Sequence, residues 1–563
     1  MTYLIRMQNG TALSLGLAAA LAAVAGGCAK PGGDDAYTVV EPLFEVAHEK
    51  TFDPEKAGWK LVFEDEFEGL SVDESKWYRP HFARKGPRIE PDGEGHLVFH
   101  MEKDEKGVIP NGYLYSVPEY EYGYYEARVR FTKSLGWWAA SWIYGGSNHN
   151  PFLDGFEIDT FEDFYTRLRD GHFLKDRMAH SIHTHIGSYV TSYQLHTEVE
   201  GPVDGWHTIA CKWGPLSVAF YLDGRLTGSY SAFNAAACIR PLHAILSAER
   251  ARGKWLGGFA KPGAEEGTYE VDWVRIWRDE SADAEAPEVG WSAETDISRV
   301  FAATGSVERL GVVAKSRFAN DPIDQLYLFD NGYMIDCTME LPCEFKVPLT
   351  AEHFATTSYG RYRGTRGAKR PAFDGYPHVF VAFARTKSGR VGHSAPIYRI
   401  PAGETPASSP YGDVPAALPG TLHAWRFDGG GQDRGYHRLL KMRYGQNRSA
   451  CPRPEEKVDC SKSRVGVTYA GEWINYTVDV AKPGTYLATF HYGTPIRSAN
   501  EALLLVDGRL AGSFTLPAEE TVEWATTLKS ETEVHLERGR HVITLMLRSQ
   551  LMFAGIDFAL KEE

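Results

Sequence analysis

The sequence has few cysteines, no basic excess and no long run of like charge, and each shortage argues against a class of protein. Its seven cysteines form no CxxC pair and no Cys/His cluster at zinc spacing, so they do not indicate a zinc site. The formal net charge of -14 argues against nucleic acid as a partner, because phosphate binding needs clustered Lys and Arg. Internal repeats are absent, and low-complexity composition is confined to linkers.

The N-terminus carries an apolar run after a single basic residue, Arg6. This run, ALSLGLAAALAAVAGGC, is too short and too rich in Ala and Gly for a membrane span, and it predicts a signal peptide over residues 1–28. AVA at residues 23–25 fits ordinary cleavage, whereas AGGC resembles a lipobox in which Cys28 is lipidated, despite Ala25 where leucine is commoner. We favour the lipobox. The expected location is the outer membrane or cell surface, through a lipid anchor, or else the periplasm or the medium.

The other six cysteines fall into three couples that are candidates for disulfides. An exported chain permits such bonds, although one sequence does not determine their connectivity. For the third couple, two separate buried thiols are an equal alternative. The couples are Cys337 with Cys343, Cys451 with Cys460, and Cys211 with Cys238.

Short alternating stretches separated by Gly, Asn and Asp predict an all-β protein. Examples are GYYEARVRF, SVAFYLDG and TYEVDWVRIW, which are typical of an antiparallel sandwich or barrel. A chain of 563 residues is too long for one core, and DESADAEAPEVG, residues 279–290, is typical of a linker. The expected order is signal peptide 1–28, linker 29–56, β domain 57–280, immunoglobulin-like domain 281–403, linker 404–417 and β domain 418–563.

The stretch DGFEIDTFEDF, residues 154–164, crowds five acidic side chains into a predicted strand. Glu157 and Asp159 project from one face, since alternate residues of a strand share a face. Glu162 breaks this alternation. A β-bulge at Thr160 or Phe161 would return Glu162 to the face of Glu157.

With that bulge, the two glutamates suit a retaining glycosidase. Their Cα atoms would lie roughly 13 Å apart at ~3.3 Å per residue. Side chains leaning inward would bring the carboxyls to about 5 to 6 Å. One glutamate would attack while the other donates a proton, and Asp159 would help to set the two protonation states. The alternative is an exposed acidic edge strand, but the apolar opposite face and the nearby aromatics LGWWAASW argue against it.

EIDTFE resembles the bulged E-x-D-x-x-E signature of glycoside hydrolase family 16, a β-jelly roll. FEDEFEGLSVDESKW, YEYGYYEARVRF, GWWAASW, DGWHTIACKWGPLSVAFYLDG and YEVDWVRIW are similar to further strands of that family, in order over about 220 residues. The resemblance implies that Glu157 is the nucleophile, Asp159 its electrostatic partner and Glu162 the acid/base. The further residues it implies for the substrate cleft are Trp138 and Trp142, with His183 or His185, which share the same strand parity.

Several positions depart from the family pattern and affect the expected glycan. PLHAILSAERARGKW gives Ser247 and Glu249 where many members have Asn, and Lys212 replaces a common glutamate; we expect these changes to touch substrate contacts. Glu249 and, in the same stretch, Trp255 are further candidates for substrate binding. The basic runs near Arg84 and Arg167 would suit sulfated sugars if they flank the cleft. We favour solvated loops for both runs.

TYAGEWINYTVDVAKPGTYLATF resembles a family 6 carbohydrate-binding module, a lectin-like β-sandwich. The resemblance implies that Trp524 stacks on sugar, whereas Trp425 stands where that family has a calcium ligand. We expect Trp473 to be a core residue. The domain before this module is expected to be a spacer without catalytic residues.

The predicted function is an endo-acting retaining β-glycosidase that hydrolyses a β-1,3- or mixed-linked glucan. The alternatives are a β-galactanase of the agarase, porphyranase or carrageenase type, and a non-catalytic surface protein that binds glycans. We expect no required cofactor and no metal at the catalytic residues; the resemblance allows a structural calcium. The expected partners are the polysaccharide and, through the lipid anchor, the membrane, and the protein is expected to be a monomer.

Overall fold

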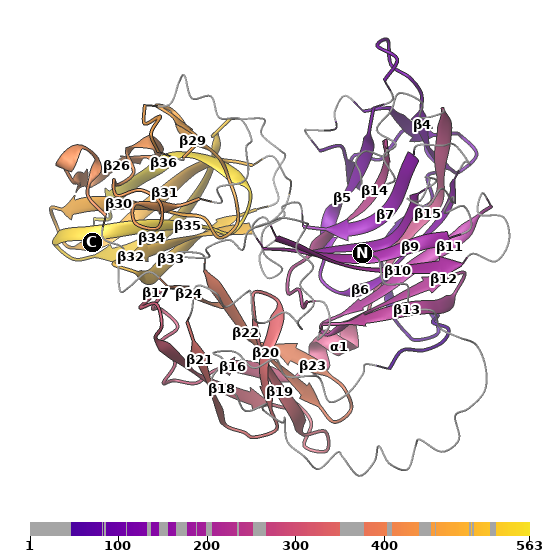
Figure 1. Cartoon of the computed structure of the whole chain (residues 1–563), viewed down its shortest axis with the longest axis horizontal. Coiled ribbons are helices and arrows are strands. Elements are labelled where there is room, and N and C mark those ends of the chain that lie inside the picture. Colours follow the sequence, from indigo (N-terminus) through magenta and orange to yellow (C-terminus); the bar gives the residue numbers. More distant parts are fainter. Residues whose placement is uncertain are drawn as a thin grey trace.

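Strands dominate the computed structural model of the protein, in agreement with the predicted all-β class (Figure 1). No helix in the described part of the chain is both long and apolar enough to span a bilayer. The residues that the structure describes are 47–80, 83, 86–108, 110–131, 137–145, 156–164, 177–186, 189–198, 205–232, 236–250, 266–349, 377–401, 408–438, 452–456, 458–494, 497, 500–517 and 525–562. The predicted signal peptide and Cys28 lie outside them.

The N-terminal unit, β1 to β15, is a sandwich of two sheets. The eight-stranded sheet has the order β13-β12-β11-β6-β15-β4-β3, with β1 paired to β15. Its strands are β1 (Lys60–Asp65), β3 (Arg88–Pro91), β4 (Leu97–Met101), β6 (Gly123–Phe131), β11 (His207–Gly214), β12 (Ser217–Leu222), β13 (Arg225–Ser231) and β15 (Gly267–Arg278).

The seven-stranded sheet of the same unit carries the acidic stretch. Its order is β10-β9-β8-β7-β14-β5-β2. Its strands are β2 (Trp77–Tyr78), β5 (Gly112–Tyr120), β7 (Trp137–Tyr144), β8 (Phe156–Phe164), β9 (Arg177–Ile186), β10 (Tyr189–Glu198) and β14 (Leu242–Arg250).

A hydrophobic core fills the space between these two sheets. Alternate residues of β6, including Tyr125 and Val129, meet Ile158 and Leu246 from the other sheet. Because burial of each such side chain contributes about 1.5–3 kcal/mol, this core fixes which face of every strand points outward. The free face of the seven-stranded sheet is therefore available for polar side chains.

The middle unit, α1 to β24, begins inside the segment predicted to be a linker. It has a three-stranded sheet, β16-β18-β21, and a six-stranded sheet, β17-β24-β22-β19-β20, with β23 paired to β22. The elements are α1 (Glu280–Glu285), β16 (Glu288–Trp291), β17 (Phe301–Ala302), β18 (Val307–Lys315), β19 (Ile323–Asp330), β20 (Tyr333–Thr338), β21 (Cys343–Pro348), β22 (His378–Thr386), β23 (Val391–His393) and β24 (Ile397–Pro401).

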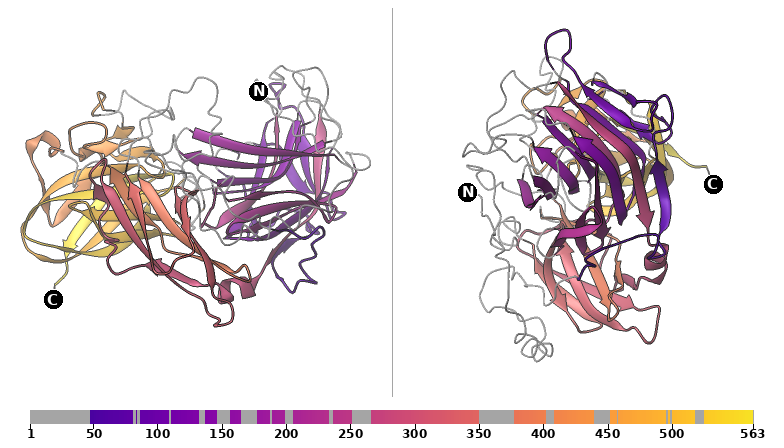
Figure 2. Two further views of the ribbon diagram at one scale, coloured as in Figure 1. Left: turned by 60° about the horizontal axis from the view of Figure 1, so that its bottom comes forward. Right: turned by 90° about the vertical axis from the view of Figure 1, so that its right-hand side faces the viewer.

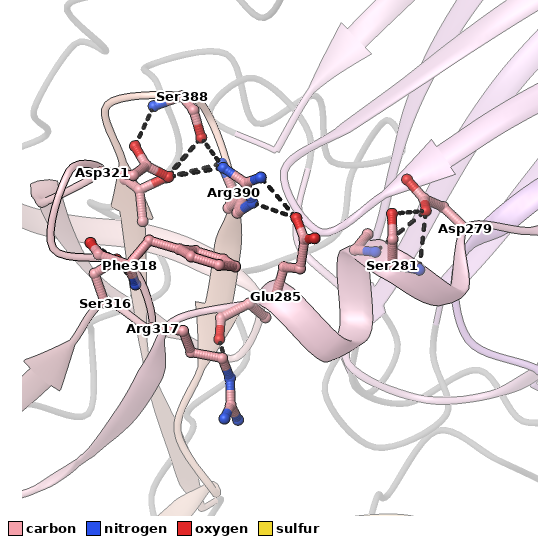
Figure 3. Close-up of polar contacts among 12 residues, drawn as sticks. Asp279, Ser281, Glu285, Ser316, Arg317, Phe318, Asp321, Ser388 and Arg390 are labelled. Atoms are coloured by element: carbon pink, nitrogen blue, oxygen red, sulfur yellow. Dashed lines mark hydrogen bonds and ion pairs between the residues drawn. The ribbon is translucent and has the colours of Figure 1, made fainter. Parts of the chain in front are cut away.

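The prediction of a linker over residues 279–290 is wrong, because polar contacts fix this segment to the middle unit (Figure 3). The Asp279 carboxylate accepts hydrogen bonds from two amides of the first turn of α1. At the other end of α1, Glu285 lies 2.6 Å from the guanidinium of Arg390, which also pairs with Asp321 at 2.9 Å. The helix thus joins the first two units through a defined contact.

The C-terminal unit, β25 to β36, is a second large sandwich. Its sheets have the orders β25-β30-β35-β32-β33, with β27 on β30, and β28-β29-β36-β31-β34, with β26 on β36. Two short 3₁₀ helices cover Tyr411–Asp413 and Ala424–Arg426. The strands are β25 (Ala416–Leu418), β26 (Gly420–His423), β27 (Tyr436–His437), β28 (Cys460–Ser461), β29 (Arg464–Thr468), β30 (Trp473–Val480), β31 (Gly484–Gly493), β32 (Asn500–Val506), β33 (Arg509–Leu516), β34 (Leu528–Leu536), β35 (Gly539–Leu547) and β36 (Leu551–Leu560).

The three units pack against one another, and the middle unit contacts both others (Figures 1 and 2). One buried hydrophobic cluster combines Ala237 of the first unit, Phe301 of the middle unit and Trp473 of the last unit. Trp473 is fully buried, which confirms it as a core residue. The tip of the β19–β20 hairpin enters the first unit, where Tyr333 shares a 2.5 Å hydrogen bond with Thr184 of β9. The middle unit is therefore more than a spacer.

The predicted disulfides are not present among the described cysteines. Cys337 is disulfide-bonded, but Cys343 is free, because Cys337 packs into the cluster shared by the three units while Cys343 packs into the core of the middle unit. Cys211 and Cys238 are both buried and form no disulfide, as the alternative interpretation expected. Cys460 forms no disulfide either, and Cys451 lies outside the described residues.

Candidate active site

The predicted β-bulge is present in β8, and it falls at Thr160 and Phe161. On one side, Trp142 pairs with Asp159 while the preceding residue of β7, Ser141, pairs with Phe161, so Thr160 has no opposite residue. On the other side, the register with β9 shifts between Asp159 and Glu162. The strand therefore contains one extra residue between its two glutamates.

The bulge places two consecutive residues in the core and returns Glu162 to the free face. The Thr160 hydroxyl donates to Cys211 Sγ at 3.3 Å across the sandwich, and the Phe161 ring lies in the hydrophobic core. Glu162 accepts a hydrogen bond of 2.9 Å from the Ser181 hydroxyl. Ser181 pairs with Asp159 in the sheet, so Asp159 and Glu162 lie on one face.

His183 of β9 completes this carboxylate cluster. It pairs across the sheet with Glu157, and its Nε2 lies 3.0 Å from Asp159 Oδ2. Donor atoms of Glu157, Asp159 and His183 all lie within 4.8 Å of one another, which is close enough to hold a metal ion. In this arrangement, the imidazole nitrogen Nε2 forms an ion pair with the Asp159 carboxylate. His183, one of the two histidines predicted for the cleft, therefore contacts the carboxylates.

Burial raises the pKa values of two carboxyls in this cluster, those of Asp159 and Glu162. Burial, followed by the charge of Glu157, raises the pKa of Asp159 to about 6. Burial and the charge of Asp159 raise the pKa of Glu162 well above its usual value. Burial opposes the charge of His183, but its hydrogen bond to Asp159 and the three carboxylates outweigh this and raise its pKa to about 10. The direction of the Glu162 shift favours the protonated form of this carboxyl.

An aromatic group lies beside the carboxylates on the same face. Trp142, paired with Asp159, donates its indole N–H to Ser247 Oγ at 3.1 Å. Tyr144 is paired with Glu157 and stacks on Trp142 with ring centroids 5.4 Å apart. Tyr113 and Tyr115 of β5 continue the group. The alternation in GYLYSVPEY is a sequence signal for these two tyrosines. Neither they nor Ser181 and Tyr144 were among the predicted site residues.

The other predicted site residues have different outcomes. Glu249 accepts a hydrogen bond of 3.4 Å from the Asn111 amide. Lys212, a departure from the family pattern, lies in the eight-stranded sheet and pairs with Glu49 at 3.0 Å, so it is not on the sheet that carries the carboxylates. The side chains of Trp138 and His185 lie outside the described part of the structure, as do Trp255, Trp524, Arg84 and Arg167.

Comparison with protein families identifies this unit. The family model described as "Glycosyl hydrolases family 16" matches residues 78–275, which include the bulged strand β8. The chain therefore contains a glycosyl hydrolase family 16 domain. It is a glycoside hydrolase, as the sequence analysis predicted. No curated protein matches the chain.

Similar solved structures also match the chain. A β-1,3-glucanase from Mycobacterium marinum shows 25% sequence identity over 39% of this chain and 99% of its own, with a TM-score of 0.30. The laminarinase catalytic domain from Thermotoga maritima shows 21% identity over 39% and 98%, with a TM-score of 0.33. Porphyranase B from Zobellia galactanivorans shows 20% identity over 39% and 92%, with a TM-score of 0.32.

Proposed function

We propose that the protein is an exported, endo-acting, retaining β-glycosidase that hydrolyses a β-1,3- or mixed-linked glucan. The observation that carries this proposal is the bulge in β8, which gathers Glu157, Asp159 and Glu162 on one face. A regular strand would turn Glu162 into the core. The bulge thus supports a pair of glutamates that work together in a family 16 domain.

In the proposed reaction, the two glutamates have opposite protonation states. The Glu157 carboxylate attacks the anomeric carbon while Glu162 gives its proton to the glycosidic oxygen, so that the bond to the leaving sugar breaks and a glycosyl ester forms on Glu157. Glu162 then takes a proton from water, whose oxygen attacks the same carbon and releases Glu157. The raised pKa of Glu162 supports its role as the acid in the first step.

Asp159 and His183 act through the glutamates in this proposal. Asp159 lies between them in the strand and places a carboxylate beside each, which raises the pKa of Glu162. His183, protonated at neutral pH, holds Asp159 at 3.0 Å and offsets part of the negative charge of the cluster. Asp159 thus favours the protonated form of Glu162, whereas His183 reduces the repulsion among the buried carboxylates.

A sugar chain would lie along the aromatic group beside the carboxylates. Trp142, Tyr144 and Tyr115 offer apolar rings on the face that carries the catalytic trio. Ser247 and Glu249, at positions that depart from the family pattern, lie on the neighbouring strand β14. We propose that these two residues contribute to the choice of glycan. The C-terminal unit as a glycan-binding module and the lipid anchor at Cys28 are further parts of the proposal.

A reducing-sugar assay on a panel of polysaccharides tests the proposal. The panel holds β-1,3-glucan, mixed-linked glucan, agar, carrageenan and porphyran. We expect new reducing ends with one of the β-glucans, and NMR of the first product is expected to show the β-anomer. An initial α-anomer would exclude retention. Binding of a glycan with no release of reducing ends would favour a non-catalytic binding protein.

A further inference from the structure

A row of side chains crosses the free face of the seven-stranded sheet from the carboxylates to its edge. Directly opposite residues of neighbouring antiparallel strands share a face. Asp159 on β8 is opposite Trp142 on β7, and the row then passes through β14 and β5 to the edge strand β2. Its members are Asp159, Trp142, Ile245, Tyr115 and Tyr78.

The edge of this row is contacted by the C-terminal unit, through Arg497. The Arg497 main chain forms hydrogen bonds with the side chains of Tyr78 and His243. Its guanidinium lies over the Tyr78 ring, 5.9 Å from the ring centroid, which is within the range of a cation–π contact. A residue more than 400 positions along the sequence from Tyr78 therefore sits at the end of the same face.

A cavity of about 630 Å³ opens at this contact. Arg79 lines this cavity, and its guanidinium already donates hydrogen bonds to the carbonyls of Pro87 and Ile89 at 2.8 and 3.3 Å. Arg497 differs, since its buried Nε has no hydrogen-bond acceptor among the described residues. Glu74 and Glu90 line the same cavity, and the Glu90 carboxylate is paired with Arg88 at 2.5 Å.

The mixed lining selects the chemistry of the ligand. Sugar hydroxyls both donate and accept hydrogen bonds, so one sugar unit can accept from Arg497 and donate to a glutamate. A sulfate or carboxylate group on that sugar would lie near these two glutamates as well as near Arg79 and Arg497, so the lining offers it no net positive charge. A neutral sugar unit therefore fits this cavity best.

We propose that this cavity is a remote subsite for a neutral sugar unit of the substrate, shared between the family 16 domain and the C-terminal unit, with Arg497 as its specificity residue. The inference rests on the proposed function. Four strand spacings separate β8 from β2, about 19 Å at ~4.8 Å per spacing, so the subsite engages a long chain and not a short one. Arg497 contributes binding energy far from the bond that breaks.

Steady-state kinetics on two substrates test the subsite. KM and kcat are measured on long β-1,3-glucan and on a β-1,3-linked trisaccharide, for the wild type, Arg497→Ala and Arg540→Ala. Arg540 is the control, because it lies exposed in the same unit, paired with Asp479. For Arg497→Ala, the ratio of the polymer KM to the trisaccharide KM is expected to rise about tenfold, with kcat on the polymer unchanged. Arg540→Ala is expected to keep the wild-type ratio.

Calorimetric titration gives a second readout that needs no turnover. Long β-1,3-glucan oligosaccharide is titrated into Glu157→Gln with and without Arg497→Ala, and the double variant is expected to bind about tenfold more weakly. An unchanged KM ratio together with unchanged affinity would overturn the subsite while leaving the proposed function intact. A wild type that cleaves no β-glucan would overturn the proposed function, and the subsite with it.

Discussion

Buried carboxylates occur in two regions of this protein, and their partners differ. In the middle unit, Glu308 is 2% exposed and meets two arginines: Arg299 contacts both oxygens at 2.6 and 2.8 Å, and Arg399 Nε lies at 2.8 Å. In β8, Glu162 is also 2% exposed, yet its hydrogen-bond donor is the neutral hydroxyl of Ser181. Among the described residues, the cation in contact with this cluster is the imidazole of His183, which lies 3.0 Å from Asp159.

The difference separates a structural carboxylate from a reactive one. Guanidinium groups stay charged at all ordinary pH values, so Glu308 is held by two permanent charges and good hydrogen-bond geometry. In β8, three carboxyls lie near the single charge of His183. Burial, and next the charges of the neighbouring carboxylates, raise the pKa values of Glu162 and Asp159. The first arrangement holds a charged carboxylate, and the second favours a protonated one, as the proposed acid requires.

The largest expected effect comes from Glu157→Gln, which removes the nucleophile and leaves the shape of the cluster. We expect kcat on the best polysaccharide to fall at least about 10⁴-fold. Reducing-end release measures it, and Glu64→Gln, an exposed glutamate of β1, is the control that should retain full activity. Retained turnover in Glu157→Gln would contradict the nucleophile assignment.

Glu162→Gln tests the proton donor and is expected to lower kcat by about 10²- to 10⁴-fold. The amide keeps the contact with Ser181 and is neutral, like the protonated acid, so the thermal midpoint is expected to stay the same or to rise. An aryl β-glycoside with an activated leaving group should lose less activity, because it needs less protonation. An equal loss on both substrates would argue against an acid role.

Arg399→Met tests how much the buried pair with Glu308 contributes to stability. It leaves the buried Glu308 with one arginine and is expected to lower the free energy of unfolding by about 3–5 kcal/mol, with kcat unchanged. Urea denaturation measures this value. The exposed pair Arg309 and Glu344 is the control, and Arg309→Met should cost less than about 1 kcal/mol. Equal costs in the two variants would remove the distinction between the pairs.

His183→Gln has the smallest expected effect on activity. It is measured as a change in the pH dependence of kcat/KM. The His183 charge lowers the pKa of Glu162, so its loss should move the basic limb of the kcat/KM profile to higher pH. Because the folded pKa of His183, about 10, exceeds its ordinary 6.5, its charge stabilises the fold below pH 6.5. The stability gap between wild type and variant should therefore close as pH rises through 10. A profile that moves to lower pH would contradict the assignment.

The strand pattern of this protein could be predicted closely from its sequence. GYYEARVRF coincides with β6, and TYEVDWVRIW falls within β15. Period-two alternation reports local geometry, and a strand that buries one face needs no other information. The bulge was predictable for the same reason, since the five-residue separation of Glu157 and Glu162 conflicts with strict alternation.

Cysteine pairing and the linker were mispredicted, because both depend on contacts between distant segments. Cys337 and Cys343 are close in sequence but pack into different clusters. The segment 279–290 has a linker composition, yet Glu285 finds Arg390 more than 100 residues later. Composition and spacing carry no information about such partners.

The sequence by itself determined the strands, the irregularity in β8 and the choice of three carboxylates, because local alternation and side-chain chemistry are enough for these. Only the tertiary structure decided that His183 contacts Asp159, that Tyr333 enters the first unit and that Arg497 reaches Tyr78. Such contacts follow from how sheets and units pack, and packing depends on shape over the whole chain.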